Sequence, residues 1–265
     1  MAGPRNFLFA PDSADVALTQ LLATARRVTG FMDGAPGAPL PGWYQPGGDN
    51  RAVLENLHGR LATAFPDAGT AFHAVRLWTN LVWQPAYLAV IAVHVHGAVP
   101  DLRTMTQAIK GIDISGFRMV AGEQYRAEPE AMIAQAGADL RALANDMLGE
   151  INAITRLKPI TALRLLADRI LGLMLRLEHY AGLDTAGQKR MAALWMEATS
   201  LTGQGDLASL SLEDGNEVLI LERKGCCLDY RAFPGRYCSS CPKQDSKVRI
   251  SRQMEEAIAE REVSA

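Results

Sequence analysis

The chain has 265 residues, of which 48% are hydrophobic and 21% charged, and its formal net charge is −2 at pH 7. These values are typical of a globular protein, so they exclude long disordered, collagen-like and coiled-coil proteins. The slight acidic excess argues against a dedicated nucleic-acid-binding protein, because phosphate recognition normally requires a basic surface. A chain of this length forms one large domain or two small ones and needs neither disulfides nor metals to build its core.

Apolar periodicity predicts helices through most of the first half of the chain. An amphipathic helix capped by Asp12 or Ser13 is expected to end at Gly30, and a loop rich in proline and glycine follows at residues 33–49. The other elements expected in this half are helices at residues 50–65, 70–97 and 101–110 and a strand within residues 116–126.

The most lipid-like stretch of the chain lies at residues 77–96. We expect a buried core helix here that is kinked or broken at Pro85. Only residues 86–93 are continuously apolar, far fewer than the ~20 that a membrane-spanning helix needs. The first 18 residues also lack the apolar run and cleavage site of a secretory signal. We therefore expect a cytoplasmic protein without stable membrane insertion.

The second half of the chain is predicted to hold three long helices and one clear strand. The helices are expected at residues 128–157, 159–180 and 185–201, and the strand at residues 217–223. The fold class that follows is α+β and helix-dominated, with a little sheet. We expect three parts, a mainly helical body, a small Cys-rich lobe and a charged tail, at residues 1–215, 216–250 and 251–265.

All four cysteines of the chain fall within sixteen residues: Cys226, Cys227, Cys238 and Cys241. Cysteines crowded in this way, in a chain without an export signal, are typical of one metal site rather than of disulfides. The Cys238–Cys241 half is a usual chelating turn. The adjacent pair is unusual, because neighbouring side chains in an extended segment point to opposite faces, so both reach one site only if the backbone bends, for instance at Gly225.

Three kinds of site remain open on this spacing. Structural zinc normally uses two CxxC knuckles, and only one is present here. A 2Fe–2S cluster needs one thiolate pair for each iron and tolerates irregular spacing better, so the spacing favours a cluster. Redox-active thiols are the third reading.

The segments GCCLDYR at residues 225–231 and FPGRYCSSCP at residues 233–242 resemble the C-terminal signature of the FhuF-type ferric-siderophore reductases. That family is marked by a C-C-x10-C-x2-C pattern that holds a 2Fe–2S cluster. The resemblance implies that Cys226, Cys227, Cys238 and Cys241 bind the cluster in the lobe. It implies further that the helical body binds a ferric siderophore, with the hydroxamate type favoured.

Charge around the cysteines is locally positive. From Glu222 to Arg249 there are seven basic and three acidic residues, a difference of +4. The basic residues are Arg223, Lys224, Arg231, Arg236, Lys243, Lys247 and Arg249. Such cations raise the potential of an anionic cluster, and they also suit the docking of an acidic electron donor such as a ferredoxin or its reductase. An ordinary solvated surface is the alternative.

The histidines give little support for a second metal site. His94 and His96 would share a face in a strand but diverge in a helix, so we expect core or helix-end residues. His58, His73 and His179 are isolated.

Two groups of side chains are candidates for lining a siderophore cleft. One is the series of cations on adjoining helices, in which Arg169 and Arg176 share a face; its other members are Arg156, Lys158 and Arg164. The alternative for these is a solvated helix face. The second group is the loop pair Trp43 and Tyr44, which could cover an organic chelate, whereas Trp78 and Trp83 are expected in the core.

No nucleotide-binding motif is expected to function. Residues 203–208, GQGDLA, match the letters of a dinucleotide fingerprint but follow a helix rather than a strand. A reductase without a nicotinamide or flavin signature needs a partner to bring electrons. The sequence thus predicts a ferric-siderophore reductase that passes one electron from a 2Fe–2S cluster to chelated iron and serves iron uptake. The alternatives are a binding protein with structural zinc and an electron carrier to another enzyme.

Overall fold

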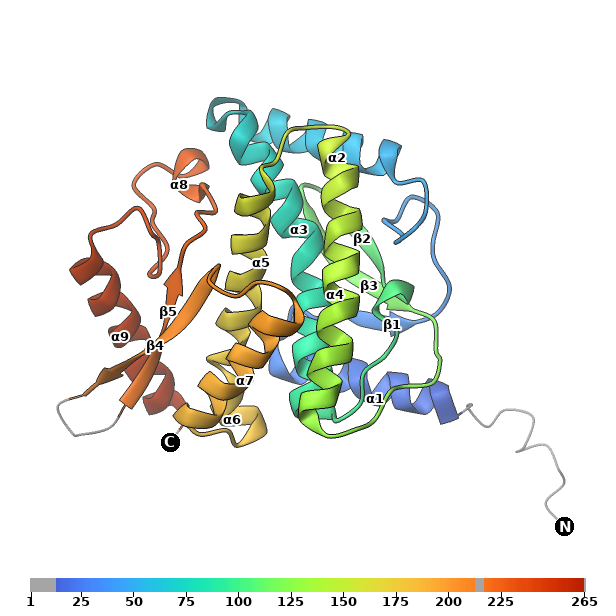
Figure 1. Cartoon of the computed structure of the whole chain (residues 1–265). Helices are drawn as coiled ribbons and strands as arrows, with labels where there is room; N and C mark the ends of the chain where they lie inside the picture. Colours follow the sequence, from blue (N-terminus) through green and yellow to red (C-terminus); the bar gives the residue numbers. More distant parts are fainter. Residues whose placement is uncertain (1–12, 213–216, 265) are drawn as a thin grey trace, which may run out of the picture.

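The computed structural model describes residues 13–212 and 217–264 of the chain. Helices dominate, and the strands form one three-stranded sheet and one two-stranded hairpin (Figure 1). This confirms the helix-dominated α+β prediction. The elements are α1 (Ser13–Val28), β1 (Gly34–Pro36), α2 (Arg51–Ala64), α3 (Thr70–Ile91), β2 (Thr106–Lys110), β3 (Asp113–Met119), α4 (Pro129–Asn152), α5 (Pro159–Met174), α6 (Leu177–Ala181), α7 (Thr185–Ala198), β4 (Gly205–Ser211), β5 (Glu217–Arg223), α8 (Asp229–Ala232) and α9 (Ser246–Ser264).

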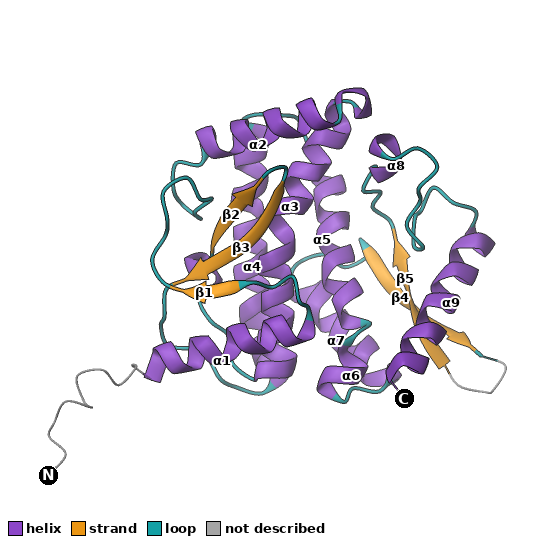
Figure 2. Cartoon of the chain, turned by 180° about the vertical axis from the view of Figure 1, so that it is seen from behind, coloured by secondary structure: helices purple, strands orange, loops and turns teal. Residues whose placement is uncertain are grey.

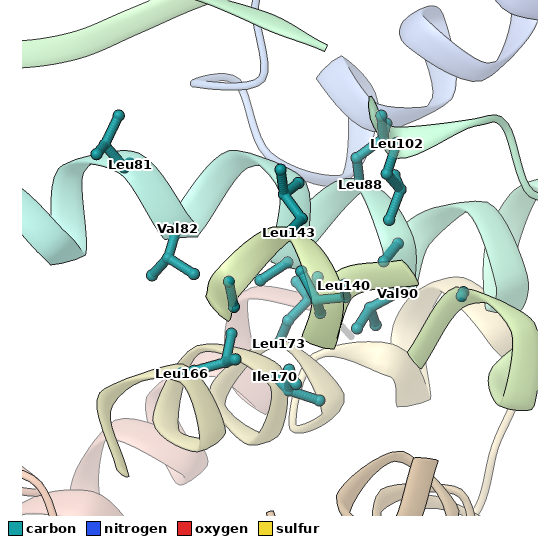
Figure 3. Packing of buried hydrophobic residues seen from close by; sticks show 14 of the residues in the cluster. Leu81, Val82, Leu88, Val90, Leu102, Leu140, Leu143, Leu166, Ile170 and Leu173 are labelled. Atoms are coloured by element: carbon teal, nitrogen blue, oxygen red, sulfur yellow. The ribbon is translucent and has the colours of Figure 1, made fainter. Parts of the chain in front are cut away.

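The centre of the body is the packing of α3 against α4 and α5. Leucine, isoleucine and valine side chains from these three helices meet there, as Figure 3 shows for Leu140, Leu166 and Ile170. Trp78 on α3 is fully buried and donates a hydrogen bond of 2.9 Å to the Ala162 carbonyl on α5. Trp83 is partly buried and packs against the same core. Both tryptophans are therefore core residues, as predicted.

Of the kink or break predicted at Pro85, the break is wrong, because α3 continues through this residue to Ile91. A proline inside a helix normally leaves the carbonyl four residues earlier without a hydrogen-bond donor. Here that carbonyl belongs to Leu81, and the buried side chain of Gln107 donates to it at 2.9 Å. A residue of β2 therefore replaces the missing backbone donor and keeps the helix intact. Among the described helices, none is both long and apolar enough to cross a bilayer.

The three-stranded sheet has the order β1-β3-β2, with β1 parallel and β2 antiparallel to β3. The helix predicted at residues 101–110 is wrong, since a short 3-10 turn at Leu102–Thr104 leads into β2. Pairing with β3 and burial of Thr106 and Gln107 outweigh local helix preference there. The strand expected within residues 116–126 is β3, which begins earlier, at Asp113.

Several element ends also differ from the predictions. The helices predicted at residues 50–65 and 185–201 are α2 and α7 with small shifts at their ends. The helix predicted at residues 128–157 ends at Asn152, and the one at residues 159–180 divides into α5 and α6. The expected caps of α1, Asp12 and Ser13, lie outside the residues or side chains that the structure describes.

The hairpin of β4 and β5 lies against α5, on the other side of the central helices from the three-stranded sheet (Figures 1 and 2). β5 coincides with the strand predicted at residues 217–223, and β4 pairs antiparallel along its whole length. The segment that resembles a dinucleotide fingerprint is the turn into β4 and the start of that strand.

The last helix, α9, packs on β5. The Gln253 side chain accepts a buried hydrogen bond of 3.0 Å from the backbone N–H of Leu221. The boundary predicted at 250/251 therefore falls inside this helix. The boundary predicted at 215/216 lies within residues 213–216, outside the described residues, between two paired strands.

The end of α3 is a π-helical turn, Ala92–His96, that holds two histidines. His94 Nε2 accepts a hydrogen bond of 2.9 Å from Trp195 Nε1, and burial lowers the pKa of His94 to about 4. His96 contacts Gln124 at 2.9 Å. Both are helix-end residues engaged in packing, as predicted.

This burial predicts an acid-sensitive stability. The pKa of His94 in the folded protein lies below the ~6.5 of the unfolded chain, so the unfolded state takes up the proton first as the pH falls. Stability that is present above pH ~6.5 is lost towards pH 4. Between pH 7.5 and 4.5 we expect the free energy of unfolding to fall by about 2–3 kcal/mol more in the wild type than in His94→Gln. Urea denaturation at both pH values measures this, and equal losses in the two proteins would rule out a buried neutral His94.

Candidate metal centre

The four cysteines lie in the connection between β5 and α9, which also contains the short helix α8 (Figure 2). Cys226 and Cys227 follow β5 directly, and both are half-buried. Cys238 is exposed, whereas Cys241 is only 2% exposed. The backbone N–H of Cys241 donates to the Cys238 carbonyl at 3.0 Å, which forms the predicted tight turn.

The thiols contact one another in two pairs. The Cys226 thiol donates to the Cys241 sulfur, and the Cys238 thiol donates to the Cys227 sulfur. The adjacent residues Cys226 and Cys227 thus have different partners. Their side chains can therefore point to opposite faces of an extended segment and still each contact another cysteine. No group of three or more His, Cys, Asp or Glu side chains within residues 13–212 and 217–264 is arranged to hold one metal ion. The arrangement is therefore pairwise rather than centred on one point.

Backbone N–H groups also point at the sulfurs. Leu228 has a φ of +61°, a left-handed conformation that is strained for a branched residue. With this turn, the N–H of Leu228 donates to the Cys226 sulfur and the N–H of Asp229 donates to the Cys227 sulfur. Amide donors of this kind stabilise negative charge on sulfur.

The thiols differ in acidity because of these contacts. The hydrogen bond from Cys238 lowers the pKa of Cys227 to about 6, against an opposing effect of burial. The pKa of Cys238 is raised, first by donating that hydrogen bond and then by burial. Burial raises the pKa of Cys226. Cys227 is thus the most acidic of these three thiols.

A buried ion pair links the cysteines to the body. Arg223 Nε donates to Asp168 Oδ2 at 2.8 Å, and Arg223 Nη1 donates to Cys238 Sγ at 3.2 Å. The two charged side chains are only 11% and 5% exposed. Burial raises the pKa of Asp168 to about 6 although Arg223 opposes this, and the pKa of Arg223 is raised by Asp168 and Cys238 although burial opposes it. The last residue of β5 therefore carries positive charge to a cysteine sulfur.

Gly225 serves a different purpose from the predicted one. Its φ is not in the left-handed region, so it does not supply a special bend. Instead, a Cβ at this position would lie 3.1 Å from Arg164 Cβ and from Asp168 Oδ2. Glycine is needed because the cysteine segment runs directly against α5.

Gly225→Ala should push the cysteine segment away from α5. We expect a loss of about 1–3 kcal/mol in the free energy of unfolding, because the backbone carbonyl carbon of Arg164 also lies 3.2 Å from the added Cβ and cannot rotate aside. Urea denaturation measures this loss. Gly59→Ala is the matched control, since a Cβ there meets nothing within 4 Å. If both variants are equally stable, the close approach of Gly225 to α5 is wrong.

A polar hollow of about 420 Å³ opens beside the cysteines. Its walls come from α3, α5, α7, β5, α9 and the cysteine segment, and Cys227 and Cys238 both line it. Arg169 and Arg176, the two cations predicted to share a face, line it together. Within the described residues neither guanidinium has a hydrogen-bond or ion-pair partner, although Arg169 lies near enough to lower the pKa of Asp168. Arg156, Lys158 and Arg164 are not among its lining residues.

A second hollow of about 210 Å³ touches three of the four cysteines, Cys227, Cys238 and Cys241. Its remaining walls are the side chains of Asp229, Tyr230, Phe233, Arg236 and Tyr237. The two hollows share Cys227, Asp229 and Cys238 and otherwise have separate linings. The Cys227–Cys238 pair thus lies between them.

The predicted loop aromatics do not belong to this site. Tyr44 is fully buried, and its backbone exchanges hydrogen bonds with Gln107 of β2. Trp43 lines neither hollow. The prediction that Tyr44 covers a chelate is wrong, because this loop is anchored to the sheet rather than open.

Two parts of the site were not singled out from the sequence. Asp168 is a charged residue within a helix that is apolar nearly all round, which is a usable signal of a buried partner. The aromatic residues of 230–237 stand between the cysteines, but their mutual stacking has no signature in the sequence.

No protein-family model matches the chain, and no solved structure matches it.

Proposed function

We propose that this chain is a cytoplasmic ferric-siderophore reductase that resembles the FhuF type, with a 2Fe–2S cluster held by Cys226, Cys227, Cys238 and Cys241. The observation that carries the proposal is the pairing of four thiols next to a hollow lined by arginines. The spacing of the cysteines supports it as well. So does the large helical body that precedes them, which is far bigger than a simple electron carrier needs.

The residues present fit such a cluster. Each of the two irons takes two thiolates, and the cysteines lie as two contacting pairs. The smaller hollow offers room against three of the sulfurs, and Arg223 with two backbone N–H groups supplies positive charge and donors. Structural zinc instead needs four ligands around one point, which suits this pairing less well.

The chemistry needs only electron transfer. Bound here, a 2Fe–2S cluster supplies one electron at a time. Siderophores hold ferric iron through hard oxygen donors, whose preference for the trivalent ion is electrostatic. One electron taken from an external donor protein converts the chelated ferric iron to ferrous iron, which then leaves the weakened chelate. No proton or covalent bond is transferred in this step.

The chain's own residues would bind and position the chelate. The larger hollow has the size of an ordinary small-molecule site, and it exposes Cys227 and Cys238 on one wall. Arg169 and Arg176 offer guanidinium donors to the oxygen atoms of a chelate. A chelate held there approaches the cysteine pair directly.

The proposal is tested with protein reduced by dithionite and freed of excess reductant. Mixing with a ferric trihydroxamate should reoxidise the protein and release ferrous iron to a ferrous-specific chromogenic chelator. The double variant Arg169→Gln with Arg176→Gln should bind the chelate more weakly, so that a higher chelate concentration is needed for half-maximal reoxidation. The control Arg156→Gln should not change this concentration. If several ferric chelates fail to reoxidise the reduced protein, yet the reduced protein transfers electrons to another redox protein, the chain is an electron carrier. A colourless zinc-containing protein would leave only the structural role.

A further inference from the structure

The outer wall of the smaller hollow is an aromatic and cationic surface. Tyr230 and Tyr237 stack with ring centroids 5.6 Å apart at 25°, and the Arg236 guanidinium carbon lies 5.9 Å from the Phe233 ring centroid. Phe233 and Tyr237 remain 39% and 40% exposed. We call these four residues, Tyr230, Phe233, Arg236 and Tyr237, the aromatic–arginine face.

This face also contacts the helical body. The Phe233 ring also packs edge-to-face on Phe65 of the body, with centroids 5.5 Å apart. Tyrosine, phenylalanine and arginine held in place are the residue types that dominate protein–protein interfaces, because they bury large area at little entropic cost.

The charge of the surrounding surface indicates the partner. Between Asp229 and Lys247 the exposed side chains include four cations: Arg231, Arg236, Lys243 and Lys247. Of the two carboxylates in this segment, Asp229 pairs with Arg76 at 3.6 Å, and Asp245 accepts from the backbone N–H of Lys247. The face therefore presents net positive charge to an approaching protein.

We infer that the aromatic–arginine face docks an acidic one-electron carrier protein of the ferredoxin class while a ferric chelate occupies the larger hollow. The inference rests on the proposed function. Its structural basis is that both surfaces reach the same pair, Cys227 and Cys238, through separate linings. The donor loses one electron on its side, and the chelated ferric iron gains one on the other. Neither partner has to leave before the other binds.

The first test compares two reductants on the full-length protein. With an acidic plant-type ferredoxin, Arg231→Glu should lower the second-order rate constant of reduction about tenfold at low salt, and less at high salt; Arg231 is an exposed cation beside this face and lines neither hollow. With dithionite its rate should match that of the wild type. Arg27→Glu, on α1 at the far end of the body from α8 (Figure 1), makes the same change in net charge and should have little effect. Equal slowing with both reductants, or equal effects of the two variants, would overturn the docking assignment.

The second test asks whether both partners bind together. The gallium(III) complex of the same trihydroxamate cannot be reduced, so it fills the larger hollow without reacting. At saturating concentration it should leave the rate of reduction by ferredoxin unchanged. Competitive inhibition would overturn the two-sided arrangement. These readouts measure entry of the electron, so they stay separate from the proposed function, which fails only if the reduced protein does not react with ferric chelates.

Discussion

Cys227→Ser is expected to abolish the visible absorption of the purified protein and chelate-dependent iron release together. Cys227 contacts Cys238, accepts the Asp229 N–H and lines both hollows, so no other thiol can take its place. A serine hydroxyl ionises far less readily than a thiol with a lowered pKa, so it does not readily replace the thiolate that the cluster iron needs. Absorption spectra and iron content of anaerobically purified protein provide the measurement.

Ser239→Ala is the control, because this residue lies within the same Cys238–Cys241 turn but carries no sulfur. It should keep the absorption and the iron. Full turnover in Cys227→Ser would contradict the assignment of four cysteine ligands. Loss of absorption with unchanged iron release would mean that iron release does not require the cluster.

The second large effect is expected at Arg223. Arg223→Gln leaves the Asp168 carboxylate, 5% exposed, without its charged partner. Breaking a buried ion pair from one side typically costs about 3–5 kcal/mol, and we expect a loss of that size in the free energy of unfolding. The same change removes the guanidinium from Cys238, so the reduction potential should fall as well, because a nearby cation favours the more negative reduced state.

A double variant separates these two effects. Arg223→Gln with Asp168→Asn leaves no unpaired buried charge, so most of the lost stability should return. The contact with Cys238 is not restored, so the potential should stay low. Arg51→Gln is the exposed control; its ion pair with Glu55 is open to solvent and should contribute less than about 1 kcal/mol. Urea denaturation and a redox titration give the two readouts, and unchanged stability in Arg223→Gln would contradict the buried pair.

Much of the helical body could be predicted because its apolar spacing is strong. The helices α1, α2 and α7 and the strand β5 follow from local pattern and breakers. The errors occur where contacts with residues distant in the sequence determine whether a segment forms a helix or a strand. Gln107 reaches α3 and keeps the helix whole at Pro85, and pairing with β3 turns residues 106–110 into a strand. Neither contact can be read from a window of neighbouring residues.

The site shows the same division. The cysteines and the shared face of Arg169 and Arg176 follow from spacing alone. The pairing of each adjacent cysteine with a different partner depends on the left-handed Leu228, for which the sequence has no signal. Gly225 was expected to permit a bend but instead packs closely against α5, a contact between segments about sixty residues apart.

The most direct test of the account is electron paramagnetic resonance of the anaerobically purified protein before and after dithionite, with iron and acid-labile sulfide measured on the same sample. A 2Fe–2S cluster on these cysteines should give iron and sulfide in equal amounts, a silent oxidised state, and a spin-half signal on reduction that disappears when a ferric hydroxamate is added. Zinc in place of iron, or iron without sulfide and without that signal, would contradict it.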